Sequence, residues 1–228
     1  MKTCNIYRLG LVPFDSALKL QARLCELRRE KVIPDTLLLL EHPPVITLGR
    51  HGDEKNIIAP PGVLEREGIP VFRTERGGDV TCHSPGQLIG YPILDLKEGR
   101  ITVSGYVWKL EEVVIKTLAD FGITAGRSAR ARGVFAAREK LCALGLRIAG
   151  GVSYHGFALN VNTNLRYFDY IVPCGLSGVR VTSMARLLGY ELDMAQVKET
   201  LAMRFAQEFN LELKAVSEPN IDLARVKE

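Results

Sequence analysis

Hydrophobic residues near the start of the chain recur at helical spacing. Between Asp15 and about Arg29 the apolar positions lie on one face and the charged positions on the other. The apolar face carries Leu20, Leu24 and Leu27, and the polar face carries Arg23, Glu26 and Arg28. Asp15 is of the residue type that caps a helix N-terminus. This pattern predicts an amphipathic surface helix.

Segments of strand length follow. Apolar runs without a charged residue cover Thr36 to Leu40, Val45 to Leu48 and Leu88 to Leu94, and further strands are predicted at Val71 to Thr74, Leu141 to Ile148 and Phe157 to Val161. Runs without polar alternation are typical of strands that are buried on both faces. Hairpin-length links join several of them, which favours a sheet that is not a regular βαβ winding.

Three further segments predict helices. The first places Tyr106, Leu110, Val113 and Phe121 on one face, with Gly122 as a stop signal. A short helix is expected from Ser183 to Leu188. A last helix is expected to start at Asp193 and to turn Met194, Val197, Leu201 and Phe205 inward. The chain is therefore predicted to be α+β (mixed α/β), with residues 1–228 forming one domain.

Composition and charge narrow the class of partner. The 228 residues are 46% hydrophobic and 25% charged and carry a net charge of +4, which suits transient docking of acidic partners and not nucleic-acid binding. The basic run from Arg127 to Arg132 is either a solvated loop or a docking patch for an anionic protein or cofactor arm.

Targeting signals and disulfides are not indicated. The N-terminus lacks the apolar core of a signal peptide, and no stretch has the length of a membrane span, so we expect a cytoplasmic protein that makes no membrane contact. Five scattered cysteines without CxxC spacing are expected to remain thiols.

Familiar cofactor motifs are missing from the sequence. It contains neither a phosphate-binding G-x-x-x-x-G-K-[ST] loop nor G-x-G-x-x-G, and no G-x-S-x-G elbow of serine hydrolases. The histidines and cysteines have no usual ligand spacing, so no metal site is expected. The remaining candidates for chemistry are the Gly77-Gly78 pair, which is either a tight turn or a close backbone approach to a ligand, the histidines and the cysteines.

Cys174 lies between Pro173 and Gly175, where the glycine leaves one side of the sulfur open. A thiol with an ordinary pKa of about 8.5 is only about 3% thiolate at pH 7, so a nucleophile here needs a cation or a base nearby. Lys140 or a histidine would serve, whereas a buried inert cysteine is the alternative.

Four segments together resemble the lipoyl(octanoyl) transferase family, which moves octanoyl groups from acyl carrier protein to lipoyl domains. They are Leu39-Leu40-Glu41-His42-Pro43-Pro44-Val45, Arg76-Gly77-Gly78 with His83 and Pro85-Gly86-Gln87-Leu88, Ser153-Tyr154-His155-Gly156-Phe157-Ala158-Leu159-Asn160, and Ile171-Val172-Pro173-Cys174-Gly175. Their order and spacing agree with the family over roughly residues 5 to 210.

The resemblance implies the fold of biotin and lipoate protein ligases, which is a mixed sheet flanked by helices with a smaller second sheet beside it. It implies an acyl thioester on Cys174, with Lys140 as the partner lysine. The substrate-binding residues that it implies are Arg76, Gly77, Gly78, Asp79, Val80, Thr81, Cys82, His83, Ala143, Leu144, Gly145, His155, Gly156, Phe157 and Ala158.

Three positions depart from the family's pattern. The family usually has an aromatic residue in place of Cys82, glycine in place of Ser84, and Gln or Lys in place of Asp79. Loss of an aromatic ring at Cys82 is expected to widen or reshape the acyl pocket.

The expected reaction is the first step of endogenous lipoate synthesis, without any cofactor except the phosphopantetheine arm that carries the acyl donor. The expected partners are octanoyl-acyl carrier protein, the lipoyl domains of 2-oxoacid dehydrogenase complexes and the glycine cleavage H protein, with the enzyme acting as a monomer. The alternatives are an ATP-dependent lipoate ligase of the same fold, a cysteine thioesterase using His155 or His83, and a noncatalytic binding module.

Overall fold

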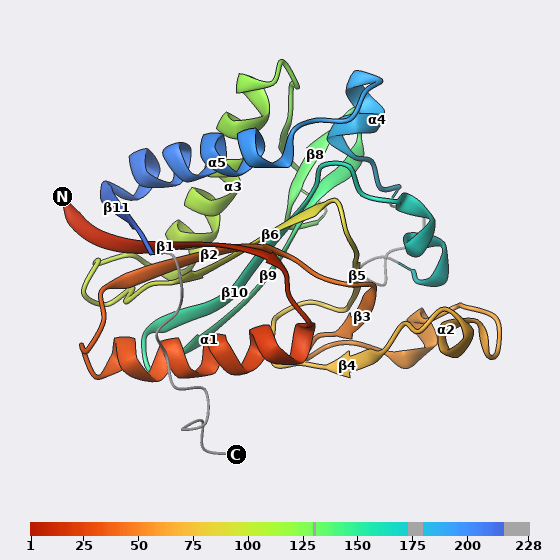
Figure 1. Ribbon diagram of the computed structural model, residues 1–228, viewed down its shortest axis with the longest axis horizontal. Coiled ribbons are helices and arrows are strands. Elements are labelled where there is room, and N and C mark those ends of the chain that lie inside the picture. Colours follow the sequence, from red (N-terminus) through yellow and green to blue (C-terminus); the bar gives the residue numbers. More distant parts are fainter. Residues whose placement is uncertain (130, 173–179, 217–228) are drawn as a thin grey trace.

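The computed structural model describes residues 1–129, 131–172 and 180–216. Among these, eight strands form a large mixed sheet in the order β11-β1-β2-β6-β10-β9-β8-β7, and three form a small sheet in the order β4-β3-β5. In the large sheet β1 pairs in parallel with β2 and β11, and the other neighbours are antiparallel. The expected mixed sheet with a smaller second sheet is confirmed (Figure 1).

The strands of the large sheet have the following bounds: β1 (Lys2–Leu11), β2 (Asp35–Glu41), β6 (Gln87–Ile93), β7 (Gly126–Arg127), β8 (Val134–Ala136), β9 (Glu139–Ala149), β10 (Val152–Asn160) and β11 (Leu211–Ala215). Those of the small sheet are β3 (Val45–Leu48), β4 (Val71–Arg73) and β5 (Val80–His83). The helices are α1 (Phe14–Arg29), α2 (Val63–Arg66), α3 (Val103–Asp120), α4 (Met184–Leu188) and α5 (Met194–Phe209), with short 3-10 turns η1 (Glu54–Asn56) and η2 (Leu165–Tyr170).

Helices cover both faces of the large sheet (Figure 1). On one face α3 and α5 pack on the larger hydrophobic cluster, to which Tyr106, Leu110, Leu201 and Phe205 contribute. On the other face α1 packs on a second cluster. Because both faces are covered, every residue of β6 is buried, as the uninterrupted apolar run predicted.

The predicted helices and strands are present, with three departures. The N-cap of α1 is Pro13, which makes no side-chain hydrogen bond, so the expectation of an Asp15 cap is wrong. Arg28, predicted to be exposed, is 4% exposed because its guanidinium pairs with Asp35 at 2.6 Å and with Glu98 at 2.7 Å. Strand β5 (Val80–His83) directly follows the Gly77-Gly78 pair, in a segment for which the sequence had predicted no strand.

Strands β6 and β10 approach each other closely near their centres. Phe157 pairs with Gly90, and the Phe157 ring occupies the place that a side chain at Gly90 would need. A Cβ atom at Gly156 would overlap the Gly90 carbonyl oxygen and lie 2.8 Å from Pro92 Cδ. The backbone of β10 can therefore follow this path only with glycine at position 156.

We predict that Gly156→Ala lowers the free energy of unfolding by roughly 2 to 4 kcal/mol, because the added methyl group meets backbone atoms that cannot rotate away. Urea unfolding followed by circular dichroism measures the change. Gly10→Ala is the matched control in β1, since a Cβ atom there meets nothing within 4 Å and the loss should stay within about 0.5 kcal/mol. Equal stability of the two variants would contradict the packing described for β6 and β10.

Candidate active site

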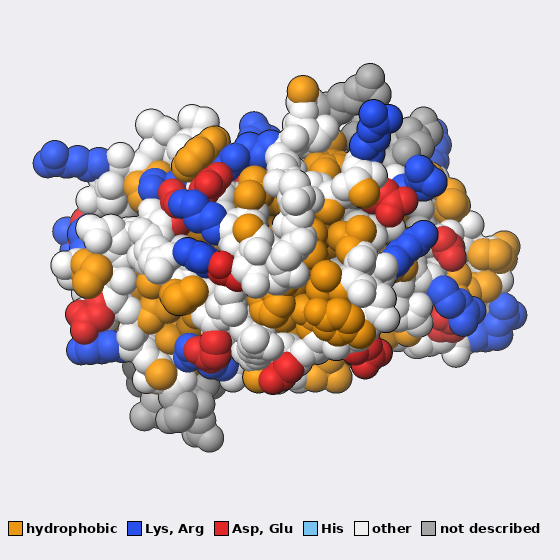
Figure 2. Space-filling view, turned by 90° about the horizontal axis from the view of Figure 1, so that it is seen from above, with side chains coloured by type: hydrophobic (Ala, Val, Ile, Leu, Met, Phe, Trp, Pro, Cys, Tyr) orange, Lys and Arg blue, Asp and Glu red, His pale blue; other side chains and the backbone are white. Residues whose placement is uncertain are grey.

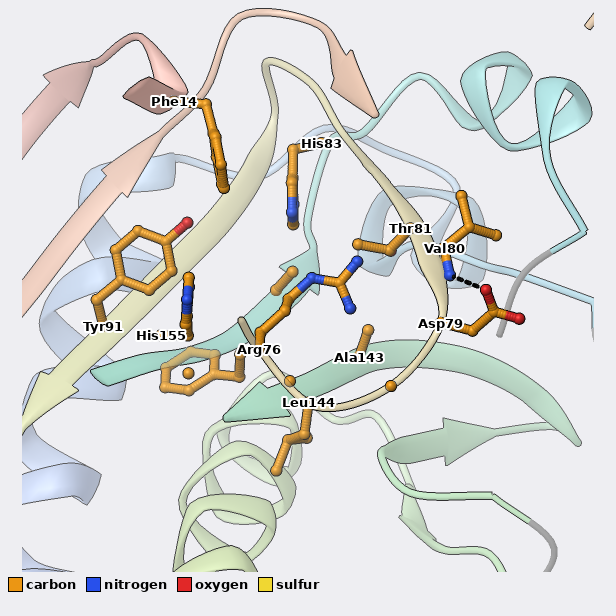
Figure 3. A pocket seen from close by; sticks show the side chains of 15 residues that line it. Phe14, Arg76, Asp79, Val80, Thr81, His83, Tyr91, Ala143, Leu144 and His155 are labelled. Carbon is orange, nitrogen blue, oxygen red and sulfur yellow. Dashed lines mark hydrogen bonds between the residues drawn. The ribbon is translucent and has the colours of Figure 1, made fainter. Parts of the chain in front are cut away.

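A mostly apolar cavity lies where the small sheet and the segment that follows β4 meet β6, β9 and β10 of the large sheet (Figure 3). It is lined by Phe14, Arg76, Gly78, Asp79, Val80, Thr81, His83, Tyr91, Ala143, Leu144, Gly145, His155, Gly156, Phe157 and Ala158. The structure thus brings together residues from three segments that are far apart in the sequence.

The predicted substrate-binding residues line this cavity, apart from Gly77 and Cys82. Cys82 is 1% exposed and packs in a separate cluster of the small sheet with Ile46, Leu48 and Ile69. Because side chains alternate along a strand, His83 faces the cavity and Cys82 turns away from it. The structure therefore gives no support to the expectation that Cys82 reshapes the acyl site.

Two cavity residues were not found from the sequence. Phe14 comes from the first turn of α1 and Tyr91 from β6. Tyr91 shares the α1 side of the sheet with Ile89 and Ile93, so strand alternation alone would have placed it on that face. Sequence periodicity gave no signal that Phe14 and Tyr91 line the same cavity.

Arg76 fixes the segment that closes the cavity. Its guanidinium is buried and donates to the Thr47 hydroxyl at 2.8 Å, to the Thr47 carbonyl at 2.6 Å and to the Gly77 carbonyl at 3.2 Å. The Gly77 N–H in turn donates to the Leu146 carbonyl on the edge of β9 at 2.8 Å. These bonds join the small sheet to the large one.

Glycines allow the backbone around Gly78 to lie close to its neighbours in the two sheets. Gly78 has φ of 90°, in the region that favours glycine. A Cβ atom on Gly145 would lie 3.0 Å from Arg76 Cδ, and one on Gly49 would overlap the Gly78 carbonyl oxygen. The Gly77-Gly78 pair is therefore both a turn and a close backbone approach to a cavity.

Asp79 organises the chain beside the cavity. Its carboxylate accepts hydrogen bonds from the backbone N–H groups of Val80 at 2.7 Å and Asp53 at 3.1 Å, and from the Asn56 side chain at 2.5 Å. The Asn56 carbonyl then accepts from the Val172 N–H at 2.7 Å. Asp79 thus connects the cavity wall to the residue that lies two positions before Cys174.

Three histidines are buried in or beside the cavity. His42 donates from Nδ1 to the Val12 carbonyl at 2.6 Å and accepts from the Tyr91 hydroxyl at 2.8 Å. His83 Nδ1 lies 2.8 Å from the side-chain oxygen of Gln87. His155 has φ of 55°, and its Nε2 has no hydrogen-bond partner among the residues that the structure describes.

Burial makes these imidazoles poor proton acceptors. It lowers the pKa of His42 to about 4 and the pKa values of His83 and His155 to about 3, and the neighbouring positive charge of Arg76 lowers the latter two further. All three side chains are consequently neutral at physiological pH. His83, His155, Phe14 and Tyr91 therefore add no charge to the cavity wall, whose charged residues are Arg76 and Asp79.

Lys140 lies near the start of β9 and is 5% exposed. Its Nζ lies 5.5 Å from the centre of the Phe135 ring. Its backbone N–H donates to the Arg180 carbonyl at 2.8 Å, and its carbonyl accepts from the Thr182 N–H at 3.0 Å. The described chain from Arg180 to Thr182 therefore runs beside Lys140.

Cys174 itself, with Pro173 and Gly175, lies outside the described residues. The described residues on the two sides of that segment are Val172, bonded to Asn56, and Arg180, bonded to Lys140. Both ends adjoin residues of the site.

A second, larger groove adjoins the cavity, and the two share Gly78, Asp79, Leu144 and Gly145. Lys140 lines this groove, as does Gly77, which the sequence had assigned to substrate binding. The backbone around Gly78 and Gly145 therefore separates an apolar chamber from a groove that contains the predicted partner lysine.

Within residues 1–129, 131–172 and 180–216, no cluster of three or more His, Cys, Asp or Glu side chains could hold a metal ion. In the same part of the chain, none of the helices has the length and apolarity needed to cross a membrane.

Known proteins of two kinds share this fold. A lipoate-protein ligase A bound with ATP matches with a TM-score of 0.77 at 14% identity, covering 96% of this chain and 90% of the ligase. A biotin protein ligase from Aquifex aeolicus, in complex with biotin and ATP, matches with a TM-score of 0.55 at 16% identity, covering 90% and 70%. At such identities the likeness shows the fold alone, and it confirms the ligase-like fold that the sequence predicted.

Similarity in sequence identifies the family more specifically than similarity in fold does. Residues 13–206 match the family described as the lipoyl protein ligase A/B catalytic domain. An octanoyltransferase from Solibacter usitatus is 48% identical over 213 residues, which make up 93% of this chain and 96% of the relative. The chain therefore belongs to the lipoyl protein ligase A/B catalytic-domain family and, within it, to the octanoyltransferases, which are acyltransferases.

Proposed function

We propose that this enzyme transfers an octanoyl group from octanoyl-acyl carrier protein to the acceptor lysine of lipoyl domains, through a thioester on Cys174. The acceptors would be lipoyl domains of 2-oxoacid dehydrogenase complexes and the glycine cleavage H protein. The observation that carries the proposal is the mostly apolar cavity, which shares Gly78, Asp79, Leu144 and Gly145 with the groove that Lys140 lines.

The chemistry of the cavity lining suits a saturated acyl chain. The apolar part of the lining includes Phe14, Ala143 and Ala158, and the histidines in the cavity wall are neutral. Burying the six methylenes of an octanoyl group is worth about 5 kcal/mol, at about 0.8 kcal/mol for each CH₂. That is enough to anchor the acyl group while its carbonyl carbon stays at the junction with the groove.

The first half-reaction forms a thioester on Cys174. A Lys140 ammonium beside the thiol would favour the thiolate, which attacks the donor carbonyl carbon. The new C–S bond forms as the bond to the phosphopantetheine sulfur breaks, and Lys140 gives its proton to the departing thiolate.

The second half-reaction forms an amide. Neutral Lys140 accepts a proton from the ammonium of the acceptor lysine, whose amine then attacks the thioester carbonyl carbon. The C–N bond forms, the Cys174 thiolate leaves, and the second proton of the amide nitrogen passes to solvent. Deprotonating a lysine with a pKa of about 10.4 at pH 7 costs about 4.6 kcal/mol, which transfer to Lys140 would help to offset. No ATP is needed, since the amide is more stable than the thioester.

The oxyanion requires N–H donors. The Gly77 N–H already donates to Leu146, so it is not available for that role. In this loop the Gly78 N–H is the candidate donor, and Gly78 lies at the junction of cavity and groove.

The thioesterase alternative needs a histidine that accepts a proton during hydrolysis. His83 and His155 have pKa values of about 3, and an effective general base has a pKa near the working pH. Their burial therefore argues against hydrolysis and for transfer.

Incubation with octanoyl-acyl carrier protein should add the mass of one octanoyl group to the enzyme, and an apo lipoyl domain should then remove it as an amide. Intact-mass spectrometry follows both steps, and hydroxylamine should release the adduct. Cys174→Ala should abolish loading, whereas Cys82→Ala, which removes a thiol that lies outside the cavity, should keep it.

Persistence of the hydroxylamine-sensitive adduct in Cys174→Ala would refute the assignment of the nucleophile. Free octanoate released without acceptor would show a thioesterase. A requirement for ATP would show a ligase.

Lys140→Met should slow loading at pH 7 by roughly tenfold or more, because the thiolate loses its neighbouring cation while the buried aliphatic packing is kept. The deficit should shrink as the pH rises toward about 8.5, where a cysteine ionises without help. Rapid-quench measurements of loading from pH 6.5 to 9 give the profile, and profiles of equal shape would remove Lys140 from the mechanism.

A further inference from the structure

The groove beside the cavity has a hydrophobic floor and a charged rim. It runs between the start of α3 and the part of β9 that continues beyond its pairing with β8. Its hydrophobic lining residues, here called the floor, are Val103, Val107, Leu144, Leu146 and Ile148, and its polar and charged lining residues, here called the rim, are Arg50, His51, Glu75, Asp79, Arg132, Lys140 and Arg147. Figure 2 looks onto the α3 and α5 side and shows hydrophobic side chains gathered at the surface there, with both basic and acidic side chains around them.

The acidic groups of the rim already have partners. Glu75 accepts a hydrogen bond from the Tyr154 hydroxyl at 3.0 Å and pairs with Arg147 at 3.4 Å. Asp79 accepts hydrogen bonds from three donors, of which Asn56 is one. Neither carboxylate is left to neutralise the other cations of the rim.

Two arginines of the rim have no such partner. Arg50 and Arg132 make no ion pair with any residue in the described ranges, and Arg50 is exposed. Nε of Arg147 is buried and has no hydrogen-bond partner in the same ranges. Helix α3 begins at Val103 in the groove wall, where its dipole adds positive potential. The groove is therefore an electropositive channel with an apolar floor.

The two ends of the basic run from Arg127 to Arg132 have different surroundings in the structure. Arg127 pairs with Glu111 and Glu112, and its guanidinium lies 4.5 Å from the centre of the Trp108 ring. The charge of Arg127 is therefore paired with carboxylates of α3, and these contacts hold the loop on that helix. Arg132 instead lines the groove, so this end of the run remains available to an anion.

The length of the groove and its charge indicate which ligand it can hold. Along β9 the groove reaches from Lys140 to Ile148, about 26 Å at roughly 3.3 Å per residue. A phosphopantetheine arm has 13 bonds from sulfur to phosphorus and spans roughly 16 Å when extended, since a chain of three backbone bonds spans about 3.6 Å. The groove can therefore hold an arm that ends in one phosphodiester.

This inference rests on the proposed function. We infer that the groove binds the phosphopantetheine arm of the carrier-protein donor, with Arg50 and Arg132 facing its phosphodiester. The thioester end then reaches the junction at Gly78 and Gly145, where the acyl chain enters the cavity.

The test compares two minimal donors, octanoyl-4′-phosphopantetheine and octanoyl-pantetheine, which differ only in the phosphate. For the unmodified enzyme, kcat/KM of Cys174 loading should be higher with the phosphorylated donor. The ratio of the two values should fall at least about threefold in Arg50→Ala and in Arg132→Ala, and further in the double variant. Arg66→Ala, which removes the same charge from α2 outside the groove, should keep the ratio.

A second measurement does not require turnover. Isothermal titration of 4′-phosphopantetheine should show weaker binding to the double variant than to Arg66→Ala. A ratio near one for the unmodified enzyme, or a ratio that survives in the double variant, would overturn the inference while loading itself stands. Absence of loading from both donors, and from the octanoylated carrier protein, would instead overturn the proposed function.

Discussion

The site depends on the hydrogen bonds that join the small sheet to the large one at Arg76. The buried guanidinium of Arg76 is held by Thr47 of β3, and the next residue, Gly77, bonds to Leu146 on β9. A buried cation without these acceptors would be costly, so the arrangement is tightly specified. Because the segment from Arg76 to Asp79 is fixed at both ends, it can form a wall between two chambers without closing either.

The division into two chambers explains how one site can hold two different ligand parts. On one side the wall is apolar and its histidines are neutral, since burial lowers their pKa values to about 3 to 4. On the other side the groove is lined by Lys140 and by Arg50 and Arg132, two arginines that make no ion pair with the described part of the chain. An acyl chain and a polar, anionic carrier arm prefer these different surroundings, and they would meet at Gly78 and Gly145.

The sequence predicted the fold class and most of the cavity because long apolar runs and family motifs mark them directly. It did not predict contacts that depend on the tertiary arrangement. Helical spacing assigned Arg28 to the solvent face of α1. In the structure it is buried, and its guanidinium pairs with the surrounding carboxylates. Cys82 was placed beside the acyl group from its position in a motif, whereas the two-residue period of β5 turns it into another cluster. Phe14 and Tyr91 reach the cavity only because α1 packs across β6 and β10.

The central claim is that the acyl chain occupies the cavity while its carbonyl group stays at the junction. Photolabelling tests it most directly. An octanoyl donor with a diazirine at the far end of the chain is loaded onto the enzyme and irradiated, and the labelled peptides are mapped by mass spectrometry. The account predicts labels on Phe14, Tyr91 and His155, at the end of the cavity formed by α1, β6 and β10. Labels confined to the groove, on Val103, Val107 or Ile148, would contradict it.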